Sequence, residues 1–375
     1  MDERCRQGGR NGAPADGHSR RAFLAAAGSG LTAATAGCLG FQLDSAGFAP
    51  PPVVEDRPSA VYVPGHSEGM GMLGRAETDD YAVAVTYSYA HRFWNVNGDD
   101  TARTDAEPDD DVHLMATVWD PETGSILPET GVEVAIERDG ELVTQEVVYP
   151  MLSQTMGFHY GGNFSLAGDG SYTVDVTVGA VRTRRTGGFR DRFEEPATLS
   201  VAFDYARADR DALSVERFDD RAGTRDALAP MAMGGFPDGK LPAADALPGT
   251  LLGTPTSDDA TLATTLLDNP PAGVDGDGPY LAVSARTPHN RRVIPAMALT
   301  ATVRRDGGTA AEAELTRTLD PELGYHYGTT LDVQSGDELR VTPTVQPQVA
   351  RHEGYETAFG GVSGGMEPVT ISVRP

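Results

Sequence analysis

The pentapeptide GFHYG at residues 157–161 recurs as GYHYG at residues 324–328, 167 positions later. The same offset relates Arg138-Asp139-Gly140 to Arg305-Asp306-Gly307, and matching leucines, prolines and valines extend the correspondence over more than sixty residues without a gap. A constant offset over this length is typical of an internal duplication. The sequence therefore predicts two tandem copies of one domain, each with a His-Tyr-Gly motif near its centre.

The segments around the first motif favour β-structure. Short stretches rich in β-branched and aromatic residues, several with alternating apolar and polar side chains, occupy residues 81–87, 112–118, 132–136, 172–178 and 197–201. Turn sequences such as Asp139-Gly140 separate them, and no strong helical period lies between them. The pattern predicts an all-β fold of two tandem immunoglobulin-like β-sandwich domains. The insert at residues 98–111 is predicted to be a solvated loop.

The N-terminus has the features of an export signal. Arg20 and Arg21 form a twin-arginine pattern, a small-residue apolar run follows, and Cys38 ends a sequence that resembles a lipobox. We expect an exported protein, anchored by a lipid on Cys38 to the extracellular face of the cell membrane. The predicted boundaries are 1–37 for the signal peptide, 38–59 for a tether, 60–207 for copy one, 208–246 for a linker with a short helix, and 247–375 for copy two.

The charge balance is strongly acidic. Lys and Arg total 30 against 55 Asp and Glu, and Lys240 is the only lysine. Such a surface suits a protein kept soluble in concentrated salt, which indicates a halophile and argues against nucleic acid as a partner. The two cysteines, Cys5 and Cys38, both precede the predicted domains, so those domains hold no disulfide or zinc-thiolate site.

No arrangement of residues typical of an enzyme is present, and we therefore expect a binding protein. The predicted domains carry few histidines but several methionines, and imidazole with thioether is a ligand combination that suits copper, whereas imidazole with carboxylate suits zinc or iron. His113 alternates with apolar neighbours, as a buried strand residue would. Near the start of copy one, His66, Glu68, Met70 and Met72 lie close together in the sequence as further candidate ligands.

Met151, His159-Tyr160-Gly161 and the following Gly170-Ser171-Tyr172 resemble the periplasmic iron-transport family of immunoglobulin-like, copper-binding lipoproteins that work beside a ferric permease. The resemblance implies a metal site that includes Met151 and His159 in copy one. In copy two it implies that His326 and His352 match family ligands, while Thr318 stands where Met151 does. The family's early His-x-Glu aligns with Val85-Thr86-Tyr87, so neither copy keeps the full set of ligands.

Together these features predict a lipid-anchored protein that binds copper, iron or zinc and takes part in iron uptake, or copper-linked iron uptake, by binding and delivery. The alternative is a structural cell-surface protein whose duplicated sandwiches serve as spacer or contact modules. Since the resembled family forms dimers, we expect the two copies to pair with pseudo-twofold symmetry inside a monomeric chain.

Overall fold

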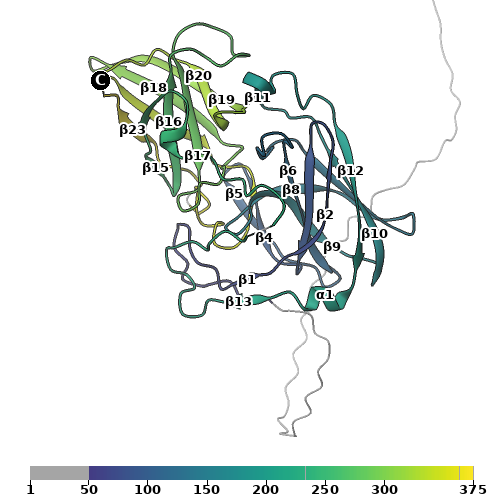
Figure 1. The fold of residues 1–375 in the computed structure, drawn as a ribbon. Helices are drawn as coiled ribbons and strands as arrows, with labels where there is room; N and C mark the ends of the chain where they lie inside the picture. The colour runs from purple at the N-terminus through teal and green to yellow at the C-terminus, as the bar shows by residue number, and fades with distance from the viewer. Residues whose placement is uncertain (1–49, 233, 363, 375) are drawn as a thin grey trace, which may run out of the picture. The chain divides into compact units, whose positions relative to one another are not determined.

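The computed structural model describes residues 50–374 except residues 233 and 363, and all of these fall in one compact unit. Arg20, Arg21 and Cys38 lie outside the described residues. The elements of the described chain are almost all strands (Figure 1), so the all-β prediction is confirmed. Among the described residues, no helix has the length and apolarity needed to cross a membrane.

Eight strands of the first half form a ladder in the order β12-β10-β7-β8-β9-β6-β3-β2. Their bounds are β2 Gly71–Glu77, β3 Ala82–Ser88, β6 Val112–Trp119, β7 Val132–Arg138, β8 Glu141–Ser153, β9 Gly157–Phe164, β10 Gly170–Val178 and β12 Ala197–Tyr205. The thirteen residues of β8 belong to both layers of a sandwich, because its first part pairs with β7 and its last part, from Tyr149, pairs with β9.

The second half repeats this ladder in the order β23-β21-β18-β19-β20-β17-β16-β14. Its strands are β14 Thr250–Gly253, β16 Ala260–Leu267, β17 Tyr280–Arg286, β18 Ala298–Arg305, β19 Gly308–Asp320, β20 Gly324–Thr330, β21 Glu338–Val345 and β23 Val369–Ser372. Each strand takes the place of its counterpart in the first half, which agrees with the constant offset in the sequence.

Alternating burial shows where the core lies. In β10 and β12 every second residue is buried, as expected of strands with one face on a core. In β3 and β6, by contrast, every residue is buried. Because successive side chains point to opposite faces, both faces of β3 and β6 are covered. One face packs in the sandwich core, and the other holds the candidate site described below.

The two halves exchange short strands. β11 (Arg184–Arg185) of the first half pairs in parallel with β19, and β22 (Ala350–Arg351) of the second half pairs in parallel with β8. β22 also pairs with β4 (Phe93–Asn97). Each half therefore supplies a strand to the sheet of the other, and β22 brings the residues that follow it onto the covered face of the first sheet.

Several connecting segments differ from expectation. The insert predicted as a loop instead contains β5 (Asp100–Thr104), which pairs with β4, and Gly98, with a φ of 62°, lies in the turn between them. The short helix is α1 (Arg207–Asp211), and β13 (Val215–Arg217), within the predicted linker, pairs with β1 (His66–Glu68). The last part of the predicted tether is docked, since the Pro51 carbonyl accepts a hydrogen bond from Arg92. The other short elements are β15 (Thr256–Ser257) and the 3-10 turns η1 (Gly187–Phe189) and η2 (Ala244–Ala246).

Candidate metal centre

The period of the strands places His113 and His159 on one face. Along β6, Val112, Leu114 and Ala116 belong to the hydrophobic core, so His113 points to the opposite side. Along β9, Phe158 and Tyr160 belong to the core, so His159 also points away from it. Both histidine side chains are fully buried. The core of the sandwich therefore fixes the strands that direct these imidazoles to the covered face.

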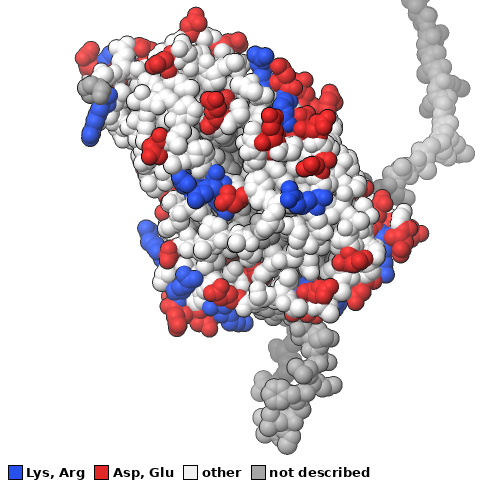
Figure 2. All heavy atoms as spheres, viewed as in Figure 1, with Lys and Arg blue, Asp and Glu red and all other residues white. Residues whose placement is uncertain are grey.

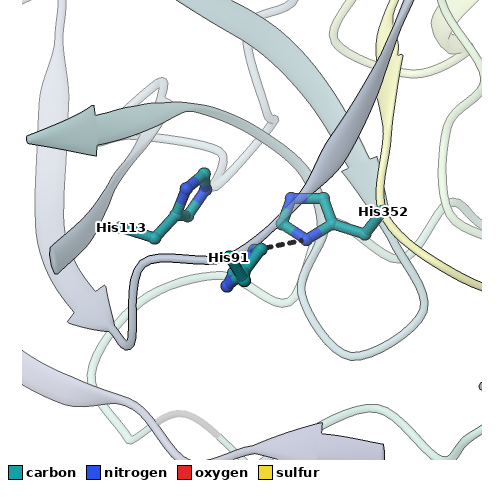
Figure 3. A group of neighbouring side chains, drawn as sticks. All are labelled: His91, His113 and His352. Carbon is teal, nitrogen blue, oxygen red and sulfur yellow. Dashed lines mark hydrogen bonds between the residues drawn. The ribbon is translucent and has the colours of Figure 1, made fainter. Parts of the chain in front are cut away.

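Four imidazoles meet on this face. His91 Nε2 lies 3.1 Å from His352 Nδ1, and His159 Nε2 lies 3.2 Å from His352 Nε2. The ring of His113 stacks on that of His91 with centroids 4.2 Å apart. Ligand atoms of His91, His113 and His352 all lie within 4.8 Å of one another, and Figure 3 shows these three side chains gathered between strands of both halves. The spacing is one that a single metal ion can bridge.

The Nδ1 atom of each first-half imidazole faces an oxygen acceptor. His159 Nδ1 donates to the Gly157 carbonyl at 3.1 Å, and His91 Nδ1 lies 2.9 Å from the Tyr89 carbonyl and 3.1 Å from a Glu68 carboxylate oxygen. His113 Nδ1 donates to Asn163 Oδ1 at 2.8 Å. Since a neutral imidazole has one N–H, each Nε2 then carries a lone pair. Anchored Nδ1 atoms of this kind are the usual outer shell of histidines that bind a metal.

In the unprotonated form that binds a metal, the four imidazoles have more lone pairs than protons to satisfy them. Burial, followed by the charge of His91, holds the pKa of His352 well below its usual value, so His352 is neutral and has one N–H. That proton can serve His91 or His159, but not both. In addition, His113 Nε2 is buried and makes no hydrogen bond. A bound cation resolves the conflict, because it accepts all of these lone pairs.

The other buried imidazoles are also neutral. Burial lowers the pKa of His159 to about 4, although the hydrogen bond to Gly157 opposes the shift. Burial, then the charge of His91, lowers the pKa of His113 well below its usual value. Metal ions compete with protons for imidazole nitrogen, so rings that stay unprotonated near pH 7 are ready to act as ligands.

Glu68 joins one further histidine, His66, to His91 of the centre. Its two carboxylate oxygens lie 3.1 Å from His66 Nε2 and 3.1 Å from His91 Nδ1. Burial raises the pKa of the Glu68 carboxyl, but the charge of His91 and the hydrogen bonds from both histidines outweigh it and lower the pKa to about 2. The carboxylate is therefore ionised and orients His91 toward His352.

Met151 completes the donor set. It is fully buried on β8, directly opposite His159 in the strand register and next to Ala350 of β22. A Cβ atom on Gly161 would lie 3.0 Å from His113 Nε2 and 3.4 Å from Met151 Sδ, so the absence of a side chain at Gly161 leaves room for both donor atoms. A thioether sulfur thus lies beside the unpaired nitrogen of His113.

A pocket connects the centre with the surface. Its space for solvent is about 90 Å³, and it is lined partly by residues in or beside the centre: His66, Glu68, Met70, His91 and His352. Met72 does not line this pocket, and its side chain is 41% exposed. The pocket offers an entry path for an ion, with methionine and glutamate side chains on its walls.

The equivalent position in the second half has different chemistry. His326 corresponds to His159, but Tyr280 replaces His113, and its hydroxyl lies 3.0 Å from His326 Nε2. Arg184, supplied by β11, donates to the Tyr280 hydroxyl, Thr318 Oγ1 and the Gly328 carbonyl, each at 2.8 Å. The Arg184 guanidinium thus supplies hydrogen bonds where the first half has a histidine. Because the Tyr280 hydroxyl lies against His326 Nε2, no imidazole lone pair is free for a metal here.

The structure therefore brings some of the predicted site residues together and separates others. Met151, His159, His352, Glu68, His66 and Met70 lie in or beside the centre. His326 lies with Tyr280 and Arg184 in the second half, because its strand, β20, belongs to the second ladder. His91 and His113 were not predicted as ligands. Only the scarcity of histidine, eight in the whole chain, could have signalled them.

One family model matches each half of the chain separately. The family described as a domain of unknown function, DUF7350, matches residues 66–201 and again residues 245–371. The chain belongs to the DUF7350 family. Both matches include a His-Tyr-Gly motif, and together they span more than half of the sequence. Among curated proteins, no sequence matches this DUF7350 chain.

Solved structures give only a weak likeness. FetP of uropathogenic Escherichia coli strain F11 is 19% identical, with 38% of this chain and 96% of FetP covered and a TM-score of 0.28. The copper-reconstituted P19 protein of Campylobacter jejuni is 16% identical, with 36% of this chain and 96% of P19 covered and a TM-score of 0.29. At these TM-scores the likeness assigns neither a ligand nor a function to the DUF7350 chain.

Proposed function

We propose that the protein binds one transition-metal ion, copper, at a centre made by His91, His113, His159 and His352 with Met151. The observation that carries this proposal is the gathering of four imidazoles, in which His113 Nε2 is buried without a hydrogen bond and the His352 ring faces both His91 and His159. A buried group without a partner costs about 1–3 kcal/mol. A cation bound at this point removes that cost, because the unpartnered nitrogen then binds the metal.

The donor types favour copper among the candidate metals. Imidazole nitrogen suits copper, iron and zinc, but a thioether such as Met151 favours Cu(I). The first-half ligands sit on neighbouring strands of one sheet, β6, β8 and β9, and in the segment after β3, which makes the site rigid. Bound copper would supply redox or transfer chemistry. The chain itself contributes binding, shielding from water and an entry pocket.

The biological role that we propose is binding and delivery of metal outside the cytoplasm, in iron uptake or copper-linked iron uptake beside a ferric permease. The twin arginines and the lipobox cysteine support export and anchoring, and the acidic surface suits a salt-rich medium. No turnover is proposed. The chain would act as a monomer, because its two halves already exchange β11 and β22.

A titration of the full chain with Cu(I), Cu(II), Fe(III) and Zn(II) tests the metal assignment. We expect one equivalent of copper to bind most tightly and the His113→Ala variant to lose that affinity, while His289→Ala, which changes an exposed histidine outside the centre, retains it. Failure of all four metals to bind would refute the function and leave a structural role. A preference for Fe(III) or Zn(II) would refute the assignment of copper but not metal binding itself.

A further inference from the structure

A second pocket lies where the linker meets the second half. It encloses about 520 Å³, and its walls come from the linker and from the segment after β17: Pro230, Asp238, Lys240, Pro288, His289, Asn290, Arg291 and Arg292. Lys240 and Arg292 form an isolated β-bridge, and Leu241 N donates to the Arg291 carbonyl at 2.9 Å, so the two walls are joined by backbone contacts. None of the lining residues belongs to the metal centre.

The pocket is mainly basic, whereas the protein as a whole is acidic. The sequence carries 55 acidic and 30 basic residues, and Figure 2 shows acidic side chains widely spread over one face, with basic side chains in small groups. In this pocket Lys240, Arg291 and Arg292 stand against one carboxylate, Asp238. The only lysine of the chain is thus placed beside two adjacent arginines.

Among the residues that the structure describes, Arg292 has one charged partner, the exposed Asp238. Its side chain is 2% exposed, and its buried Nε and Nη1 atoms make no hydrogen bond. The nearest carboxylate oxygen, on the exposed Asp238, lies 3.7 Å from Nη1, which is beyond hydrogen-bonding distance. Burial lowers the pKa of Arg292 despite the opposing charge of Asp238. A buried guanidinium with two nitrogens that lack hydrogen bonds is costly unless a ligand supplies acceptors.

A second buried arginine adds to the positive field. Arg286 is also 2% exposed and donates to the Pro242 carbonyl and to Ser284 Oγ, both of which are uncharged acceptors. Burial, followed by the charge of Arg291, lowers the pKa of Arg286 to about 10. Positive charge therefore gathers here without matching carboxylates, which raises the local attraction for an anion.

We propose that this pocket binds a small oxyanion, a carboxylate or phosphate compound, held by Arg292 from within and by Lys240 and Arg291 at the rim. A planar guanidinium presents paired N–H donors that match two oxygens of such a group, and a lysine ammonium adds a point charge. Asn290 also lines the pocket, with its amide held by Thr287 and the Gln154 carbonyl. The proposal stands on residues outside the metal centre and does not depend on metal binding.

Calorimetric titration of the full chain with inorganic phosphate and, separately, with malonate tests the proposal at constant ionic strength. We expect saturable binding of at least one probe, and a preference between them distinguishes a phosphate site from a carboxylate site. Lys240→Gln and Arg291→Gln should each weaken binding about tenfold, the effect of losing one charge-assisted hydrogen bond. Arg103→Gln is the matched control, because Arg103 pairs with Asp105 on the surface.

The Arg292→Met variant gives an independent readout. The probe that binds should raise the melting temperature of the wild-type protein and leave that of Arg292→Met unchanged, since the buried donors are gone. Absence of saturable binding with both probes, or equal affinity in wild type, Lys240→Gln and Arg291→Gln, would overturn the proposal. His113→Ala should bind the anion normally, which separates this result from failure of the metal function.

Discussion

His159 Nε2 and His352 Nε2 lie 3.2 Å apart, although 193 positions separate the two residues in the sequence. His159 comes from β9 of the first half, and His352 directly follows β22 of the second half. The His352 backbone N–H donates to the Leu152 carbonyl at 3.1 Å, which holds the backbone of His352 beside β8. The centre therefore needs both halves, and neither half alone contains the group of four histidines.

Replacing His352 tests this dependence. We expect His352→Ala to weaken copper binding more than the 10- to 100-fold typical of outer-shell changes, because it removes the nitrogen that faces both His91 and His159. Copper affinity by competition with a chelator is the measurement. His289→Ala serves as the control for loss of a histidine elsewhere in the second half. Unchanged affinity in His352→Ala would show that the second half does not supply a ligand.

Asn163 should orient the centre without touching the metal. Its Oδ1 accepts from His113 Nδ1, and its Nδ2 donates to the His91 carbonyl at 2.9 Å. We expect Asn163→Ala to lower copper affinity about 10- to 100-fold while one metal still binds at saturation. Asn95→Ala, which removes an amide that bonds Thr104 on the β4–β5 hairpin, should leave the affinity unchanged. The same small effect in both variants would count against an orienting role.

Arg184 should contribute to stability and not to metal binding. Arg184→Met leaves Thr318, Tyr280 and the Gly328 carbonyl without their donor, so the free energy of unfolding should fall by about 1.5–3 kcal/mol. The exposed Arg340 on β21 provides the control Arg340→Met, for which we expect a change within about 0.5 kcal/mol. Denaturant unfolding measures both. A lower copper stoichiometry in Arg184→Met would contradict this assignment.

The buried His326 should make the stability of the protein depend on pH. Burial lowers the pKa of His326 to about 4, from 6.5 in an unfolded chain. The unfolded state therefore binds a proton that the folded state does not between pH 6.5 and 4, and stability falls as the pH drops, by about 1.4 kcal/mol per unit from this residue. The His326→Gln variant should show a correspondingly shallower decline in metal-free unfolding experiments between pH 6.5 and 4.5. An identical slope in both proteins would contradict the buried neutral state.

Much of the fold follows from local sequence. The alternation in residues 172–178 predicts the strand observed as β10, and the repeated Arg-Asp-Gly turns mark the β7–β8 and β18–β19 hairpins. These features are local, since strand propensity and turn chemistry depend on near neighbours. The exchange of β11 and β22 depends on contacts between distant segments, which strand propensity does not record.

The centre could be predicted only in part. Met151, His159 and His352 were predicted from the resemblance of their motifs to the iron-transport family. His113 has the pattern of an ordinary buried strand residue, and the prediction that it is buried is confirmed. Its hydrogen bond to Asn163 and its proximity to His352 depend on the tertiary fold. His326 shares its motif with His159, yet Tyr280 and Arg184 give it different surroundings. The prediction of a halophile and of lipid anchoring remains a prediction.

Locating copper directly in crystals of the copper-loaded full chain, by anomalous scattering at the copper edge, is the most direct test of the central claim. We predict one peak per chain, within bonding distance of the Nε2 atoms of His91, His113 and His159 and of a His352 nitrogen, with Met151 Sδ beside it. No peak at this point, or an equal second peak beside His326 and Arg184, would contradict a single centre shared by the two halves.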